Sequence, residues 1–274
     1  MTAEAVRLSD MAIGHPERLL PVADELAPLL TQPGLVPGSA LAAQGPGALT
    51  LATAFAAEVS RTGGWVTAVG LGRMGVSAVA ERGVSLDRWV FVDEPGDAAA
   101  EVLNALIGNV DVVLLAAGVR LAAAHSRRLR TRLRERGTVV IEVAEERASR
   151  VGASGALGTA GPRGVGAFSP DVTLTVERAA WTGLGLGHGR LRERRAEVVA
   201  VGRGAASLPR RAVLWLPDAT GRIAPVPGAI DTVPWPASAG SSQTGVPVAG
   251  IPEAGAPVAV TGTDVVVPLQ RRAG

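Results

Sequence analysis

The sequence predicts an α/β protein in which a mostly parallel sheet is flanked by helices and extended by antiparallel edge strands. In the first half of the chain, short apolar segments alternate with segments of helical periodicity, which is typical of parallel strands covered on both faces. From residue 172 onward, polar and apolar residues alternate along three segments. This second pattern indicates antiparallel strands with one solvent-exposed face.

A change in composition divides the chain. Residues 219–274 contain eight Pro and eight Gly, and such a content without a repeat is typical of low-complexity segments that form no packed core. We therefore expect a helical N-terminal segment over residues 1–33, the α/β core over residues 34–218, and a disordered, flexible tail over residues 219–274. One short strand at residues 265–267 is the regular element expected in the tail.

Apolar spacing places the elements of the first half in order. Leucines recur at helical spacing over residues 18–30, and an apolar run over residues 39–44 predicts the first strand. Leu51, Phe55 and Val59 share one face of a helix over residues 49–59. Further strands are expected over residues 65–69, 89–92, 110–116 and 138–143. Helices are expected over residues 76–81, 98–106 and 122–136. Gly83 ends the first of these helices and Gly137 ends the last.

The second half of the chain has a different pattern. A Gly-rich loop is expected over residues 148–170. Alternating strands follow at residues 172–178, 190–201 and 212–216. A hairpin through residues 183–189 joins the first two of these strands.

The composition excludes several kinds of chemistry. All 27 basic side chains are Arg and none is Lys, and the chain has no Cys and only three histidines. A Schiff-base lysine, a P-loop lysine, a disulfide, a thiol nucleophile and a zinc–thiolate site are therefore excluded. We expect no bound metal and no cofactor. The net charge is only +2, so the chain as a whole is close to neutral.

Neither a secretion signal nor a membrane span is expected. Glu4, Arg7 and Asp10 interrupt the N-terminus where the apolar region of a signal peptide would lie. The sequence contains no apolar stretch of about 18 residues. The expected location is the cytoplasm, without a membrane partner.

A glycine-containing turn follows the first strand, at the place where α/β proteins bind phosphates. Residues 34–51 read GLVPGSALAAQGPGALTL. This segment resembles the opening of the ATPase core of RecA-family recombinases, where a Leu-Pro-x-Gly turn leads through a strand into Gly-Pro and the Walker A loop. The resemblance extends in element order to about residue 211 and implies a RecA-like core. It also implies a degenerate phosphate loop made of Gly45, Pro46, Gly47, Ala48, Leu49 and Thr50.

The residues needed for phosphoryl transfer do not match that family. The loop is about three residues shorter than Walker A. Ala48 stands at the position of the phosphate-binding Lys and Leu49 at that of the metal-binding hydroxyl. Asp111 begins the fourth strand, whereas the magnesium-ordering Asp belongs at its end, where the chain has Ala116. The catalytic Glu corresponds to about Leu71 or Gly72. Without these groups the charge that develops on the phosphoryl oxygens is not stabilised, and we expect no enzyme activity.

Three segments carry a second resemblance. They are GLVPGSALAAQGPG, WTGLGLGHGRLR from Trp181 to Arg192, and AVLWLP from Ala212 to Pro217. With the Gly-rich insert and the tail, they resemble ImuA-type accessory proteins of bacterial mutasomes, particularly the actinobacterial branch. The resemblance implies a non-catalytic partner of an ImuB-type polymerase homologue and of an error-prone C-family DNA polymerase. Such a protein would act in DNA-damage-induced (SOS) translesion synthesis, at the nucleoid when active.

Two alternatives stay open. One is a divergent RecA-like ATPase whose missing cation is an unrecognised Arg near Gly47, such as one from a neighbouring subunit. The other is a DNA-binding module that uses arginine-rich segments.

Two arginine-rich segments are candidates for contact with DNA or a partner. On the helix expected over residues 122–136, Leu129 and Leu133 mark the buried face, and arginines form an outer stripe. In a strand, side chains two residues apart project from the same face, as they would from Arg190 to Arg194. A solvated helix face is the alternative interpretation of the first segment. The candidates are Arg127, Arg128, Arg130, Arg132, Arg134, Arg190, Arg192, Arg194 and Arg195.

Overall fold

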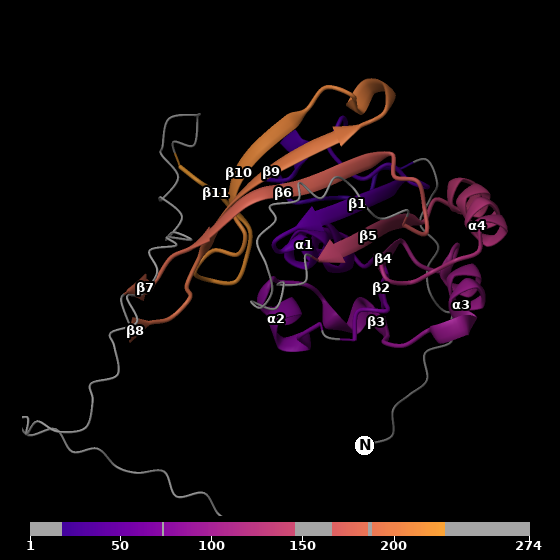
Figure 1. The fold of residues 1–274 in the computed structure, drawn as a ribbon, viewed down its shortest axis with the longest axis horizontal. Coiled ribbons are helices and arrows are strands. Elements are labelled where there is room, and N and C mark those ends of the chain that lie inside the picture. Colours follow the sequence, from indigo (N-terminus) through magenta and orange to yellow (C-terminus); the bar gives the residue numbers. More distant parts are fainter. Residues whose placement is uncertain (1–17, 73, 146–165, 186–187, 228–274) are drawn as a thin grey trace, which may run out of the picture. The chain divides into compact units, whose positions relative to one another are not determined.

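The computed structural model describes residues 18–72, 74–145, 166–185 and 188–227, all of which belong to the compact unit Met1–Pro234. Its centre is a nine-stranded sheet in the order β11-β10-β9-β6-β1-β5-β4-β2-β3 (Figure 1). The strands are β1 (Ala40–Gly45), β2 (Val66–Val69), β3 (Trp89–Val92), β4 (Val112–Ala116), β5 (Val139–Glu145), β6 (Val172–Trp181), β9 (Arg194–Gly202), β10 (Arg210–Trp215) and β11 (Ala224–Pro225).

Helices follow the strands in the order that the apolar spacing predicts. The α-helices are α1 (Ala48–Arg61), α2 (Val76–Glu81), α3 (Ala99–Leu106) and α4 (Ala123–Arg136). Short 3-10 turns lie at η2 (Ala27–Leu29), η3 (Leu86–Arg88), η4 (Gly96–Ala98) and η5 (Gly204–Ala206). The predicted hairpin is present as β7 (Leu184–Gly185) and β8 (His188–Gly189).

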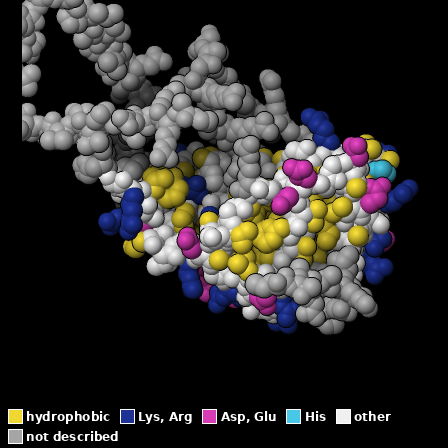
Figure 2. All heavy atoms as spheres, turned by 90° about the horizontal axis from the view of Figure 1, so that it is seen from below, with side chains coloured by type: hydrophobic (Ala, Val, Ile, Leu, Met, Phe, Trp, Pro, Cys, Tyr) yellow, Lys and Arg dark blue, Asp and Glu magenta, His cyan; other side chains and the backbone are white. Residues whose placement is uncertain are grey.

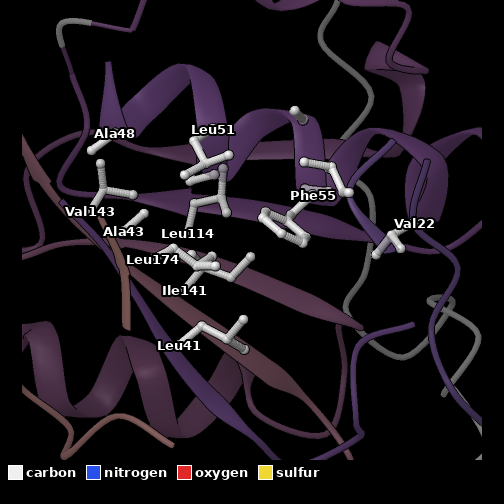
Figure 3. Close-up of a cluster of buried hydrophobic side chains, with 14 of the residues drawn as sticks. Val22, Leu41, Ala43, Ala48, Leu51, Phe55, Leu114, Ile141, Val143 and Leu174 are labelled. Carbon is white, nitrogen blue, oxygen red and sulfur yellow. The ribbon is translucent and has the colours of Figure 1, made fainter. Parts of the chain in front are cut away.

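Two hydrophobic clusters hold the helices against the sheet. On one face, α1 packs Leu51 and Phe55 onto Leu114 and Ile141 of the central strands (Figure 3). On the other face, α3 buries Leu103 and Leu106, and α4 buries Leu129 and Leu133, as their spacing on the latter helix predicts. The mostly parallel sheet between two helical layers, with antiparallel edge strands, is therefore confirmed.

The antiparallel region joins the parallel strands through β6. β6 runs antiparallel to β9, as expected for residues 172–178, and its other edge pairs parallel to β1. β9 and β10 are also antiparallel, so the three predicted antiparallel segments are confirmed. The exposed face expected for β9 is wrong, because Arg194–Ala200 are all buried.

The helix expected over residues 18–30 is also not formed. Only η2 is helical there, and Leu20 and Leu35 form an antiparallel bridge in which each backbone N–H lies 2.9 Å from the other residue's carbonyl oxygen. Pro21 and Pro28 lack the N–H groups that a continuous helix needs. The leucine spacing instead reflects burial, since Leu26 and Leu29 belong to the core on the α1 face.

The sheet continues beyond the expected end of the core. Residues Ala224–Pro225 form β11, which pairs with β10, and Ile223 packs against the core. Residues 219–227, which the composition groups with the tail, thus take part in the fold. The division of the chain into three parts stays a prediction. Residues 1–17, the Gly-rich loop over 146–165 and residues 228–274, with the strand expected at 265–267, lie outside the described residues.

Candidate functional site

The predicted phosphate loop is a tight turn. β1 ends at Gly45 and α1 begins at Ala48, so only Pro46 and Gly47 connect them. The φ angles of Gly45 and Gly47 are 92° and 86°, which lie in the left-handed region where glycine is favoured. A Walker A loop places four residues between its two glycines, and their backbone N–H groups surround the phosphates. Here a single residue, Pro46, separates Gly45 from Gly47, which is too few for that cradle.

The side chains that begin α1 serve packing. Ala48, at the position of the phosphate-binding Lys, is completely buried, and Leu49 packs against the core on the α1 face. The hydroxyl of Thr50 accepts a hydrogen bond of 3.2 Å from Nη2 of Arg82. The structure therefore brings Gly45–Thr50 together as a turn and a helix start, as the sequence predicts.

The guanidinium of Arg194 fills the space beside this turn. A Cβ atom placed on Gly47 would lie 2.1 Å from Nη2 and 2.3 Å from Nη1 of Arg194. Arg194 is only 8% exposed. Its Nε donates a hydrogen bond of 2.6 Å to the carbonyl oxygen of Leu216, and its Cζ lies 5.3 Å from the centre of the Trp181 ring.

A cation at this place is unusual on electrostatic grounds. The N-terminus of a helix carries partial positive charge and normally attracts anions, and the first turn of α1 contains no acidic residue. The Leu216 carbonyl and the Trp181 ring favour the cation from the other side. Arg194 thus occupies the approach to Gly47 with charge of the same sign as the helix N-terminus.

The other positions of an ATPase site also lack reactive groups. β4 ends at Ala116, and Asp111 lies at the opposite end of that strand. The Asp111 carboxylate is buried and accepts a hydrogen bond of 2.8 Å from the backbone N–H of Trp65. Burial raises the pKa of Asp111. Asp111 is therefore a structural group that holds β4 to the start of β2. Leu71 is half-buried and Gly72 is exposed.

On α4 the structure separates the candidate arginines into two groups. Arg130 forms an ion pair with Asp171 and donates a hydrogen bond of 3.2 Å to the carbonyl oxygen of Gly38. Nε of Arg132 lies 3.4 Å from the carbonyl oxygen of Ile107. These two guanidinium groups hold α4 to neighbouring segments. The exposed members, which stay candidates for contact with DNA or a partner, are Arg127, Arg128 and Arg134.

The second group of arginines does not form one exposed row. Arg194 and Arg195 lie in β9 and are each 8% exposed, whereas Arg190 and Arg192 precede the strand and are exposed. Backbone hydrogen bonds from Arg190 to Gly183 and from Arg192 to Thr182 fix this connection. The prediction of a period-two row is wrong because the strand begins only at Arg194.

Sequence reasoning missed one buried acid. Glu142 lies within β5, is 5% exposed, and accepts a hydrogen bond from the backbone N–H of Phe168. Burial raises the pKa of Glu142 from 4.5 to about 7. The sequence does contain a sign of this burial, because Glu142 is the single carboxylate inside the apolar run VVIEV.

The sheet also ends in an apolar edge. β3 is the last strand, and Val90, Phe91 and Val92 are half-buried there, while Val76 and Leu86 nearby in sequence are exposed. Figure 2 shows the side of the molecule on which α2 and β3 lie in Figure 1, and apolar side chains gather on it among charged ones. Edge strands of this kind are available for pairing with another chain.

The described part of the chain contains neither a candidate metal site nor a candidate membrane span. No three acidic or histidine side chains described in the structure come together as a metal site would require. No described helix combines the length and the apolar character that crossing a bilayer demands.

Comparisons with known proteins support the fold. The sequence profile of the family described as the MT3502 N-terminal domain matches residues 28–148. The uncharacterized protein Rv3395c of Mycobacterium tuberculosis is 32% identical over 96 residues, which cover 35% of this chain and 47% of that protein. The chain thus spans about half the length of this curated relative.

One solved structure extends the comparison to most of the described residues. The crystal structure of the RadB recombinase superposes with a TM-score of 0.50 and 17% sequence identity, covering 74% of this chain and 96% of that chain. At this identity the likeness concerns the fold alone. The fold of the core is therefore RecA-like, as the sequence predicts.

Proposed function

We propose that this chain is a non-catalytic RecA-like accessory module that acts through contacts with other proteins in DNA repair. The partners named by its resemblance to ImuA-type proteins are an ImuB-type polymerase homologue and an error-prone C-family DNA polymerase. In this proposal the complex carries out translesion synthesis after DNA damage.

The contact between Arg194 and Gly47 supports the non-catalytic role most strongly. The guanidinium stands where a phosphate would approach the helix N-terminus, and the turn contributes only the N–H of Gly47, because Pro46 has none. Neither a Lys nor a hydroxyl follows Gly47 directly. A module with this loop is better suited to holding a shape than to phosphoryl transfer.

Nucleotide binding tests this part of the proposal. The full chain is expected to hydrolyse no magnesium-ATP and to show an unchanged thermal midpoint when the nucleotide is added, because a ligand stabilises only a protein that binds it. Hydrolysis, or a midpoint that rises with ATP concentration, would contradict the non-catalytic role.

The same arginine favours a second candidate function. A divergent ATPase needs a cation near Gly47, and Arg194 of the same chain supplies one. Arg194→Ala separates the two possibilities. If Arg194 is a phosphate ligand, this variant loses a nucleotide-dependent stabilisation that the unaltered chain possesses. If Arg194 fills the loop, neither protein responds to ATP.

Co-purification tests the partner. An affinity-tagged full chain is expected to retain an ImuB-type polymerase homologue from the same genome when the two are co-expressed. The matched control is an untagged chain on the same resin. Failure to retain the homologue at any salt concentration that keeps both proteins folded would overturn the assignment to a translesion complex.

A further inference from the structure

A cavity of about 320 Å³ opens on the side of the sheet where β1 begins. It lies between the turn before β1, the second half of α4, the start of β6 and the turn η5. The phosphate loop is at the opposite end of β1, so this cavity is separate from the degenerate site. Its volume is at the lower end of the range for ligand pockets, roughly 300–1,000 Å³.

The cavity wall combines aliphatic side chains with arginines. None of its lining residues is aromatic. Val36 is 41% exposed although it lies against this wall. The Ser39 hydroxyl is buried and has no hydrogen-bond partner among the described residues. The aliphatic part of the wall consists mainly of Leu30, Leu35, Val36, Val172, Ala205 and Ala206.

The charge of the cavity is positive. Arg130, Arg134 and Arg203 line it, and Asp171 is the one acid among the lining residues. Asp171 is already neutralised, because its carboxylate accepts hydrogen bonds from Arg130 and from the backbone N–H of Ala40. Among the described residues, neither Arg134 nor Arg203 forms an ion pair.

The backbone fixes the position of one of these arginines. Gly38 has a φ angle of 75° and packs directly on α4, where a Cβ atom would lie 2.7 Å from the Cα of Arg134. Arg203 is held on the other side of the cavity by a hydrogen bond of 2.7 Å to the hydroxyl of Ser169. The backbone of Arg134 and the guanidinium of Arg203 are therefore held in place on two sides of the cavity.

We infer that this cavity binds an acidic peptide segment of a partner protein. An aliphatic side chain of the peptide enters the cavity, and flanking carboxylates pair with Arg134 and Arg203. Guanidinium–carboxylate pairs and a buried apolar anchor are the combination that gives peptide sites their affinity and orientation. A nucleic acid fits the wall less well, since single strands bind by stacking on aromatic rings.

This inference rests on the proposed function, because it names the chemistry by which the accessory module holds its partner. A phage-displayed library of random peptides, selected on the full chain, provides the probe. The selected peptides are expected to carry Asp or Glu on both sides of an aliphatic residue. The double variant R134E/R203E is expected to weaken their binding by about a hundredfold, a factor of about ten for each arginine.

Matched variants control for unspecific charge effects and for folding. R120E/R136E changes the net charge of the chain by the same amount at two exposed arginines outside the cavity and is expected to leave peptide binding within about twofold. Ala205→Trp fills the cavity without changing the charge and is expected to abolish binding. Each variant is compared only if its thermal midpoint matches that of the unaltered chain.

The outcomes separate this inference from the proposed function. If selection yields no acidic bias, or if R134E/R203E binds the peptides as well as R120E/R136E does, the cavity is not a peptide site, even if the polymerase homologue is still retained. If acidic peptides bind in the cavity but the homologue is not retained, the peptide site stands and the translesion assignment fails. Binding of a single-stranded oligonucleotide that R134E/R203E abolishes and acidic peptides do not displace would also overturn the inference.

Discussion

The guanidinium of Arg194 lies against the backbone of Gly47, so a side chain from the ninth strand fills the turn between the first strand and the first helix. This contact connects the antiparallel part of the sheet to the turn at which related folds bind phosphate. It makes Gly47 necessary for two reasons, its left-handed backbone and the space that Arg194 takes.

Gly47→Ala is therefore expected to destabilise the protein. The φ angle of 86° at Gly47 is strained for alanine, and the methyl group would displace the Arg194 guanidinium from its hydrogen bond with Leu216. Together these effects are expected to lower the free energy of unfolding by about 1 to 3 kcal/mol. Urea unfolding measures the change.

A double-mutant cycle separates the two causes. In the Arg194→Ala background, Gly47→Ala retains only the backbone strain and is expected to cost less than in the unaltered chain. If Gly47→Ala lowers the free energy of unfolding equally in both backgrounds, the Arg194 guanidinium moves aside without loss of stability. The interpretation that Arg194 fills the turn would then be wrong.

Glu142 is expected to make stability depend on pH. The unfolded chain releases this proton near pH 4.5, whereas the folded chain holds it up to about pH 7. Between these values the folded state binds more protons, so stability falls as pH rises through the window and levels off above it. The full effect is about 3 kcal/mol.

Glu142→Gln tests this expectation. The variant keeps an oxygen to accept the Phe168 hydrogen bond and carries no charge. It is expected to match the unaltered chain near pH 4.5 and to exceed its stability at pH 8, as measured by urea unfolding across that range. Glu135→Gln, at an exposed position on α4, is the control. A parallel pH profile for the unaltered chain and Glu142→Gln would refute the assignment.

Asp111 is expected to matter for folding and not for nucleotide chemistry. Asp111→Ala removes the acceptor of the buried Trp65 N–H, and an unsatisfied buried group costs about 1 to 3 kcal/mol. Asp111→Asn keeps an acceptor oxygen without a buried charge and is expected to be at least as stable as the unaltered chain at pH 7. Thermal unfolding of both variants measures the difference. Equal losses for Ala and Asn would point to a need for the charge itself.

Arg130 and Arg127 are expected to respond differently although they share one helix. Arg130→Ala breaks the ion pair with Asp171 and the hydrogen bond to Gly38, with a cost of about 2 kcal/mol. Arg127 is exposed, and Arg127→Ala is expected to change stability by less than about 0.5 kcal/mol. Chemical denaturation of the two variants side by side measures both values. A stability loss at Arg127 equal to that at Arg130 would contradict the division of these arginines.

Much of the fold follows from the sequence because the helices each bury one apolar face against the sheet. Leu51 and Phe55 on α1, and Leu129 and Leu133 on α4, lie where their spacing places them. The prediction for residues 18–30 fails since leucine spacing describes burial in a loop as well as in a helix, and two prolines prevent the helix.

The site was predictable only in part. The missing Lys after Gly47 can be read from the sequence, whereas the contact with Arg194 joins residues far apart in the chain and depends on the register of β9 beside β6. Period-two spacing suggested that Arg190 and Arg194 share an exposed strand face. Arg194 is buried and Arg190 is exposed because β9 begins to pair only at Arg194, and the spacing of arginines in the sequence does not show where strand pairing begins.

The central position of β1 has a consequence for biosynthesis. Gln44 of this strand bonds to Thr175 of β6, 131 positions later in the chain, and its other neighbour, β5, also follows only after three intervening strands. During translation β1 therefore leaves the ribosome long before β5 or β6 is synthesised, and its backbone stays unpaired and its apolar side chains stay exposed in the meantime. Pairing over such separations is slow and leaves nascent chains prone to aggregation, so the growing polypeptide is exposed to that risk until β5 and β6 pair with β1.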